Sequence, residues 1–321
     1  MSKAVKIWLI VAAALVLVGG IIWGGVMSVL QWDFTKLSTI KYETNEYRIN
    51  ETYQHISIKT NTADIRLMLS EDGSTSVVCH EAEDIKHTVT VKDGTLTIHR
   101  EDTRKWYRHI GVSIGSPTVT VYVPEGVYGA LSVESGTGKV EISRGFTFES
   151  MDIDGDTGDV VCQASVTGNG RIKTDTGHIT VQDMTAGELV LSVSTGKVKV
   201  SNITCDGDLS IKVSTGRANV TDVTCDNLIS HGNTGDLTLT NVVSDGAFTI
   251  ERSTGDVKME ACDAATLTVE TDTGNVTGSL LTDKIFMCES DTGWINVPKT
   301  VQGGVCEITT NTGNIRIHIA E

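Results

Sequence analysis

The sequence predicts an all-β fold: a parallel β-solenoid of about ten rungs of 19–20 residues, with an irregular β-rich N-terminal cap and a single transmembrane helix before it. Three observations predict this architecture. An uncharged apolar segment lies near the N-terminus, a Thr-Gly turn recurs ten times at intervals of 19 or 20 residues within 131–321, and alternating apolar residues flank each turn. We therefore divide the chain into an N-terminus at 1–6, a membrane span at 7–30, a spacer at 31–45, a cap at 46–130 and the solenoid at 131–321.

The apolar segment at residues 7–30 has the length and composition of a membrane-spanning helix. Its 24 residues carry no charge, and a helix of that length rises about 36 Å, enough to cross a bilayer core of about 30 Å. Lys3 and Lys6 precede it and Asp33 follows it, so the positive-inside rule places the N-terminus in the cytoplasm. The prediction is a single-pass cell-membrane protein whose C-terminal domain is extracytoplasmic.

A cleaved signal peptide is the alternative interpretation of the same segment. The apolar core of a signal peptide is usually about 7–15 residues long and ends at an A-x-A-like site. This segment is longer and shows no convincing site, which favours an anchor. Both interpretations leave the rest of the chain outside the cytoplasm.

The cap at residues 46–130 is rich in strand-forming residues but lacks the regular repeat. The run Thr60-Asn61-Thr62-Ala63 resembles a degenerate repeat turn between two strands. Asp93-Gly94, between two further strand-like segments, is a hairpin signal. We expect the cap to be continuous with the solenoid.

Each repeat is built around a turn glycine that follows a Thr. The residue before that Thr is Asp, Ser, Asn or Gly, and the short polar side chains among these bond readily to nearby backbone N–H groups. Glycine supplies a positive φ at no steric cost. The ten turn glycines are Gly138, Gly158, Gly177, Gly196, Gly216, Gly235, Gly255, Gly274, Gly293 and Gly313.

Apolar residues lie at fixed offsets around each turn, two residues after the glycine and five before it. Ser230 is the one clearly polar residue among them, and period-2 alternation with β-branched residues indicates strands with one buried face. A unit of two short strands cannot bury its own face, but a stack of identical units can. Rungs about 4.8 Å apart would make a rod roughly 48 Å long.

Two sequence features together resemble a known family. One is the run from Val121 to Gly126, V-Y-V-P-E-G, which leads into the first repeat at residues 131–138; the other is the train of T-G-[DKN]-V units. Residues 47–321 are thus similar to the bacterial putative-adhesin, β-strand-repeat family, domain of unknown function 4097. The resemblance implies a β-solenoid on the envelope surface with no established catalytic activity, and it carries over no functional residues.

Several short motifs look catalytic, but the repeat accounts for them better. Four repeats read D-T-G, as in aspartic proteases, yet the Asp position holds Ser, Asn or Gly in the other six. A turn position accepts that exchange, whereas a catalytic base does not. The G-x-S-x-G run at residues 111–115 precedes a strand, while a nucleophile elbow requires a helix there. We therefore predict that the protein is not an enzyme and needs no cofactor.

Two groups of stacked side chains are candidate sites. If rungs stack in sequence order, Asp156 lies beside Asp175 and Asp272 beside Asp291, and each acidic pair could bind a surface Ca²⁺ or remain a solvated edge. The solvated edge is favoured, because no further ligands are evident. Cys205 and Cys225 each lie nine residues after a turn glycine; that spacing permits a disulfide but favours two small buried thiols.

Exposed aromatic residues are the candidate contact residues. Trp294 occupies a position that otherwise holds Lys, Asp, His, Arg or Asn, so it should project outward near the distal end of the rod. Trp106 and Tyr107 lie beside Arg108 and form a second candidate, because aromatic residues and Arg are enriched in contact patches.

The acidic composition limits the class of partner. Asp and Glu outnumber Lys and Arg by 41 to 26, for a net charge of −15, which opposes nucleic-acid binding. We expect a non-catalytic binding or scaffolding surface, connected with adhesion or envelope stress, and a protein or polysaccharide partner at the cell surface. The alternatives are an enzyme acting on a surface polysaccharide and a scaffold that self-assembles through the C-terminal solenoid edge.

Overall fold

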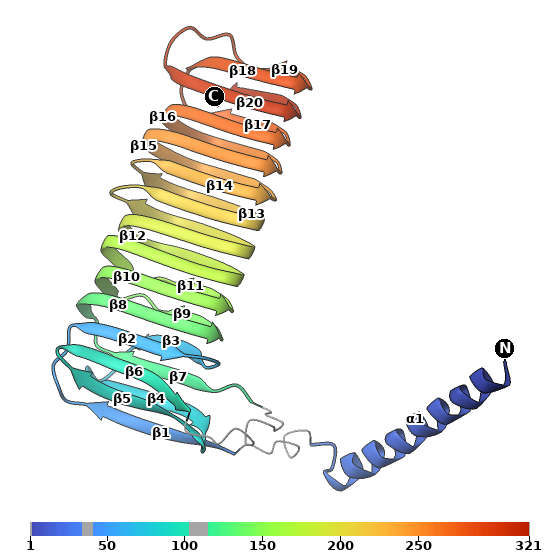
Figure 1. Cartoon of the computed structure of the whole chain (residues 1–321). Helices are drawn as coiled ribbons and strands as arrows, with labels where there is room; N and C mark the ends of the chain where they lie inside the picture. The colour runs from blue at the N-terminus through green and yellow to red at the C-terminus, as the bar shows by residue number, and fades with distance from the viewer. Residues whose placement is uncertain (1, 34–40, 103–114, 321) are drawn as a thin grey trace.

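A computed structural model describes residues 2–33, 41–102 and 115–320, and it confirms the β-solenoid with one apolar N-terminal helix (Figure 1). Helix α1 spans Lys3–Val29, and the Oγ atom of Ser2 accepts a hydrogen bond from the backbone N–H of Val5 at its start. The stretch Val5–Val29 is long and apolar enough to cross a membrane. The helix thus begins four residues before the predicted span, because Ala4 and Val5 continue its apolar character and Lys3 and Lys6 do not interrupt it.

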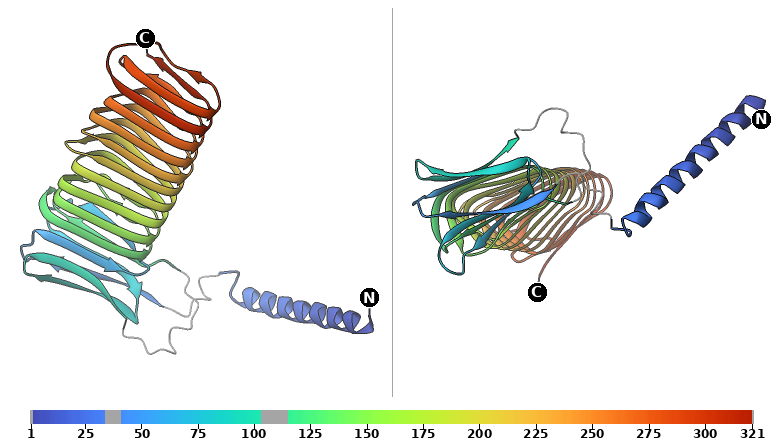
Figure 2. Two further views of the ribbon diagram at one scale, coloured as in Figure 1. Left: turned by 45° about the horizontal axis from the view of Figure 1, so that its top comes forward. Right: turned by 90° about the horizontal axis from the view of Figure 1, so that it is seen from below.

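The solenoid is a parallel stack in which each rung pairs with the rungs above and below (Figure 2). The register is one repeat: Thr195 pairs with Thr215 and Gly196 with Gly216. Its strands are β8 (Gly126–Thr137), β9 (Val140–Ile142), β10 (Phe146–Thr157), β11 (Val160–Cys162), β12 (Ser165–Cys205), β13 (Leu209–Cys225), β14 (Leu228–Thr234), β15 (Leu237–Thr254), β16 (Val257–Thr273), β17 (Val276–Leu280), β18 (Lys284–Thr292), β19 (Ile295–Asn296), β20 (Gly304–Thr312) and β21 (Ile315–Ile319).

The predicted apolar ladders form the interior of the stack. Residues two after and five before the turn glycines are buried in every rung except the outermost. Nine of the ten turn glycines have φ values between +126° and +159°. A third interior position, three residues before the glycine, often holds a hydroxyl that satisfies a turn carbonyl of a neighbouring rung: Thr174 donates to Gly158, Thr271 to Gly255 and Thr310 to Gly274.

The rungs have a second backbone corner, six residues after the turn glycine, which was not predicted from the sequence. Five residues there have φ near +50° and stack on one another: Asp183, Asn202, Asp222, Asn241 and Ala261. Asn and Asp tolerate this left-handed conformation better than other non-glycine residues. They alternate along the stack, so that the Asn202 amide donates to Asp183 at 2.8 Å and the Asn241 amide to Asp222 at 2.7 Å.

The cap contributes two rungs to the solenoid and closes its N-terminal end. Strand β2 (His55–Thr60) lies between β8 and β6 (Thr95–Asp102), and β3 (Asp64–Leu69) lies between β9 and β7 (Thr118–Val123), all parallel. Strands β1 (Tyr42–Ile49), β4 (Thr75–Ala82) and β5 (Ile85–Lys92) then add antiparallel pairs. The hairpin at Asp93-Gly94 and the turn at residues 60–63 are both present, whereas β1 already begins inside the predicted spacer.

The last rungs are stacked in an order that differs from their order in the chain. Strand β20 pairs on one side with β16, through Thr312 and Thr273, and on the other side with β18, through Thr312 and Thr292. Strand β21 likewise lies between β17 and β19. The final rung of the sequence is therefore inserted beneath the preceding one, and β18 and β19 are outermost (Figure 1). The edge at the C-terminal end of the solenoid is therefore formed by β18 and β19, and not by the last strand of the sequence.

Candidate functional site

The outermost rung leaves an apolar interior position uncovered. Ile295 is 43% exposed, whereas Ile315 and Val276 at the same position in the next two rungs are fully buried. Phe286 and Cys288 are likewise only partly buried, whereas the residues at the same positions in the next two rungs are fully buried. Strand β18 pairs with β20 on one side and with no other strand of the described residues. The distal end therefore exposes side chains of the solenoid core, and the outer edge of β18 has no partner strand among the described residues.

Apolar side chains on the outer face of the last two rungs enlarge this exposed surface. Met287 is 58% exposed, and Ile285 and Val305 are also exposed beside it on β18 and β20. Trp294 is 52% exposed, and its backbone N–H donates to Asn314 at 3.1 Å. We call Ile285, Met287, Trp294 and Ile295 the distal patch. Trp106 and Tyr107, the second predicted contact site, lie outside the described residues.

A buried ion pair fixes the outermost rung across the inserted one. The Nζ atom of Lys284, at the start of β18, lies 2.6 Å from Asp263 Oδ1 on β16, and the two side chains are 5% and 15% exposed. Lys284 also donates to Thr282 Oγ1 at 2.7 Å. Its register partner on the intervening rung is Gly304, which has no side chain to obstruct this contact. The pair thus joins β18 to β16 past β20.

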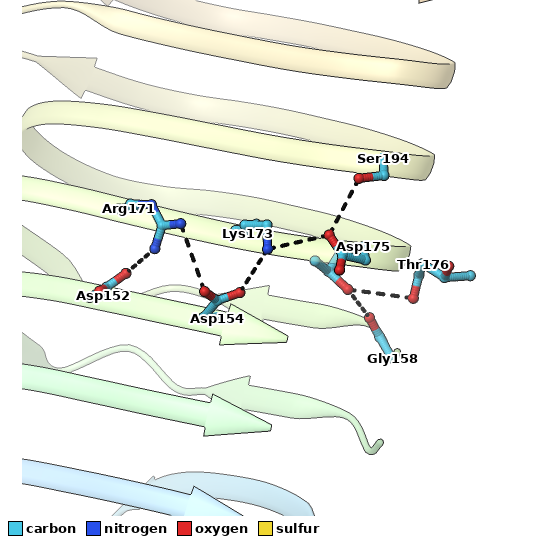
Figure 3. Close-up of polar contacts among 9 residues, drawn as sticks. Asp152, Asp154, Gly158, Arg171, Lys173, Asp175, Thr176 and Ser194 are labelled. Atoms are coloured by element: carbon cyan, nitrogen blue, oxygen red, sulfur yellow. Dashed lines mark hydrogen bonds and ion pairs between the residues drawn. The ribbon is translucent and has the colours of Figure 1, made fainter. Parts of the chain in front are cut away.

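The predicted acidic pairs have different environments. Asp156 and Asp175 do lie on adjacent rungs, but Lys173 Nζ is 3.3 Å from Asp175, and Ser194 donates to the same carboxylate at 3.3 Å (Figure 3). Lys173 also contacts Asp154, so cations already balance this edge. Such exposed pairs contribute about 0–1 kcal/mol each.

Asp272 and Asp291 are not neighbours, which corrects the predicted stacking. The inserted rung places Asn311 between them, and the Asn311 amide donates to Asp272 Oδ1 at 3.4 Å. Equal spacing in the sequence predicts adjacent rungs, but the inserted rung makes the spatial order differ from the sequence order. A shared Ca²⁺ at these two residues therefore loses its geometric basis.

The cysteines are free thiols, including Cys205 and Cys225 on adjacent rungs. Burial raises the pKa of both thiols to about 12. They are thus protonated and unreactive at neutral pH, as expected for small residues that fill an interior corner.

An arginine is buried inside the solenoid without a carboxylate contact among the described hydrogen bonds and ion pairs. Arg252 is 4% exposed, and its Nη2 donates to Ser230 Oγ at 2.6 Å. Burial lowers its pKa to about 10. Its register partner is Gly232, where a Cβ would lie 1.6 Å from Arg252 Nη1. Small residues at positions 230 and 232 therefore provide the space for the guanidinium.

This packing predicts a strong coupling between positions 232 and 252. Gly232→Ala should lower the free energy of unfolding by about 2 kcal/mol, since it overpacks the core. The cost should fall to less than half in an Arg252→Met background, because methionine is flexible enough to leave the space. Urea denaturation of both single variants, the double variant and the parent measures the coupling. An equal cost in both backgrounds would contradict it.

Sequence reasoning missed two of these features. Ser230 was the signal for the buried arginine, because it stands at a position that is otherwise apolar or Cys. The Lys284–Asp263 pair had no signal, because the two residues occupy different positions in their repeats, nine residues before Gly293 and eight after Gly255.

Comparison with one solved structure supports the fold. A crystal structure of a "putative lipid binding protein" from Parabacteroides distasonis ATCC 8503 has a TM-score of 0.50 at 14% identity, and the match covers 88% of this chain and 98% of that one. A "putative adhesin" from Bacteroides fragilis NCTC 9343 gives a TM-score of 0.39 at 15% identity, covering 87% and 97%. No curated protein matches the chain.

A family match over most of the chain identifies the family to which the chain belongs. The Toastrack DUF4097 family matches residues 53–211 and 204–321, which together include the solenoid and nearly all of the cap. The chain therefore belongs to the Toastrack DUF4097 family.

Proposed function

We propose that the chain is a non-catalytic, membrane-anchored binding protein whose distal patch binds another protein at the cell surface. The uncovered interior position at Ile295 carries the proposal. Terminal repeats of solenoids normally present a polar outer face that keeps them soluble. The cap provides antiparallel strands at one end, and the distal rung exposes core residues at the other. Adhesion and envelope-stress sensing are the roles that such a surface would serve.

The anchor in this proposal is α1. Its uncharged length suits a bilayer core, and the lysines at its start favour a cytoplasmic N-terminus. The chain enters the sheet at β1, in the cap, so the distal patch lies at the opposite end from the anchor (Figure 1). The solenoid would thereby hold the patch away from the membrane.

The chemistry of the edge favours a polypeptide as the partner. An unpaired parallel strand offers backbone donors and acceptors to an added strand. Ile285 and Met287, alternate exposed apolar residues on the outer face of β18, can then pack against alternate residues of that strand. A second copy in the same membrane is a poor fit, because two anchored copies present their distal rungs in the same direction.

Site-specific cross-linking in intact cells tests the proposal. A photoreactive p-benzoylphenylalanine replaces Met287 in the full-length chain, and a matched control carries it at Val190, an exposed position on β12 in the middle of the solenoid. We expect an adduct from position 287 alone, which mass spectrometry assigns to a different protein. Ile295→Asp should abolish that adduct, and the purified partner should protect β18 amides from hydrogen exchange.

Three results would overturn the proposal. These are equal adducts from both positions, an adduct made only of glycan, and a cross-link between two copies of this chain. Circular dichroism of each variant establishes that the solenoid is intact.

A further inference from the structure

A buried cluster of three different metal-ligand side chains lies in the cap, outside the distal patch. Cys79 and Glu81 alternate onto the inner face of β4, and the following turn brings His87 of β5 against them. One ligand atom from each residue lies within 4.8 Å of the other two. The side chains of Glu81 and His87 are 1% and 2% exposed, and Cys79 is fully buried. Sulfur, oxygen and nitrogen ligands thus converge at one point in the core.

Neighbouring groups hold the cluster in a fixed geometry. Glu81 Oε2 accepts hydrogen bonds from the His87 backbone N–H at 2.6 Å and contacts His87 Nδ1 at 2.7 Å. The other carboxylate oxygen, Oε1, accepts from the Asn45 side chain on β1 at 2.8 Å. The Tyr47 hydroxyl donates to the His87 backbone carbonyl at 3.3 Å. Partners of this kind orient metal ligands in proteins.

One atom of the cluster has no partner of its own. His87 Nε2 is buried and makes no hydrogen bond among the described residues. Leaving such a group unsatisfied costs about 1–3 kcal/mol. A cavity of about 400 Å³ borders Glu81 and His87 and is otherwise lined mainly by small and apolar residues, with Arg100 on its wall. The cavity gives a ligand or a water molecule access to the cluster.

We propose that Cys79, Glu81 and His87 form a binding site for one divalent transition-metal ion of the zinc class. Zn²⁺ is commonly bound by Cys, His and carboxylate ligands, and three protein ligands leave a fourth position for water from the cavity. A thiolate and a carboxylate also balance the charge of a divalent ion, so the filled site is neutral in the buried interior of the cap. Ca²⁺ and Mg²⁺ are disfavoured because they prefer oxygen ligands alone.

The imidazole can bind the ion through Nδ1, the ring nitrogen that contacts Glu81. A neutral imidazole that binds through Nδ1 carries its proton on Nε2, so no proton is lost from the ring. Burial and the nearby Glu81 raise the pKa of Cys79 to about 12, so the thiol keeps its proton until an ion binds. Binding therefore releases the thiol proton to solvent as the metal–sulfur bond forms.

Metal titration of the full-length chain in detergent, kept reduced and stripped with a chelator, tests the site. Co²⁺ reports thiolate ligation through a sulfur-to-cobalt charge-transfer band, and equilibrium dialysis measures Zn²⁺. We expect saturation at one ion per chain, with the band present. Cys79→Ser should abolish the band and lower Zn²⁺ affinity at least about tenfold. The matched control Cys162→Ser removes a different buried thiol and should change neither quantity.

A second variant keeps the test decisive if Cys79→Ser fails to fold. Asn45→Ala retains all three ligands and removes the hydrogen bonds that the Asn45 amide donates to Glu81 Oε1 and Glu43 Oε1, so affinity should fall about 10- to 100-fold with the band intact. Absence of saturable binding by the parent chain, or a band that persists in folded Cys79→Ser, would overturn the proposal. The distal patch is unaffected by these variants, so the two proposals fail independently.

Discussion

Replacing Gly216 with Ala is expected to lower the free energy of unfolding by about 4 kcal/mol. Gly216 has a φ of +139°, a region essentially restricted to glycine, and an Ala there costs about 1–3 kcal/mol in backbone strain. Its Cβ would also lie 1.6 Å from the carbonyl oxygen of Gly196 in the adjacent rung. That contact is with backbone, so relief requires the rungs to separate, at a further cost of about 1–3 kcal/mol.

Two control variants separate backbone strain from the contact between rungs. Gly73 has a φ of +73° and open space around its Cβ position, so Gly73→Ala should cost only about 1 kcal/mol. Gly155 lies in the solenoid interior, and its nearest contact would be an ordinary 3.5 Å, so Gly155→Ala should be close to neutral. Urea denaturation followed by circular dichroism gives all three values. Equal costs at positions 216 and 73 would show that stacking contributes nothing.

Asp263→Ala is expected to lower the free energy of unfolding by about 3 kcal/mol, because it leaves the Lys284 ammonium buried without its counter-charge. The loss should be concentrated at the distal end, where the pair joins β18 to β16. Hydrogen exchange should therefore show faster exchange of β18 amides before global unfolding.

The double variant Asp263→Ala/Lys284→Met provides the control for this second prediction. Methionine fills similar space without a charge, and apolar replacement of a buried ion pair is often neutral. We expect the double variant to recover most of the stability lost in Asp263→Ala. If it proves less stable than the single variant, the cost does not come from the unpaired charge.

The turns and the apolar ladders could be predicted from the sequence because the same residue pattern recurs in each repeat. Thr195 and Gly196 recur with the same neighbours as Thr215 and Gly216, so ten copies give one structural answer. The second corner could have been found in the same way. Asp183 and Asn202 both lie six residues after a turn glycine, but the varied residue types at that position obscured the pattern.

The order of the rungs could not be predicted, because periodicity is the same for every order of stacking. Gly274, Gly293 and Gly313 are spaced like all the other turn glycines, yet the third of these rungs lies between the first two. The candidate metal site could not be predicted either, because its ligands are brought together by the fold and not by a recognisable spacing in the sequence. Cys79, Glu81 and His87 match no known ligand spacing, and only the turn between β4 and β5 brings them together.

The inserted rung also affects the pathway by which the chain folds. A chain that added rungs in order of synthesis would first place β18 directly on β16, in the position that β20 finally occupies. That intermediate keeps the 19-residue repeat but brings Asp291 beside Asp272, where carboxylates about 5 Å apart repel one another.

In the native order Asn311 separates the two acids and donates to Asp272. The native order therefore avoids this contact between two carboxylates. The outer rung can reach its native position only after β20 and β21 have been synthesised, because these strands lie between it and the rest of the stack.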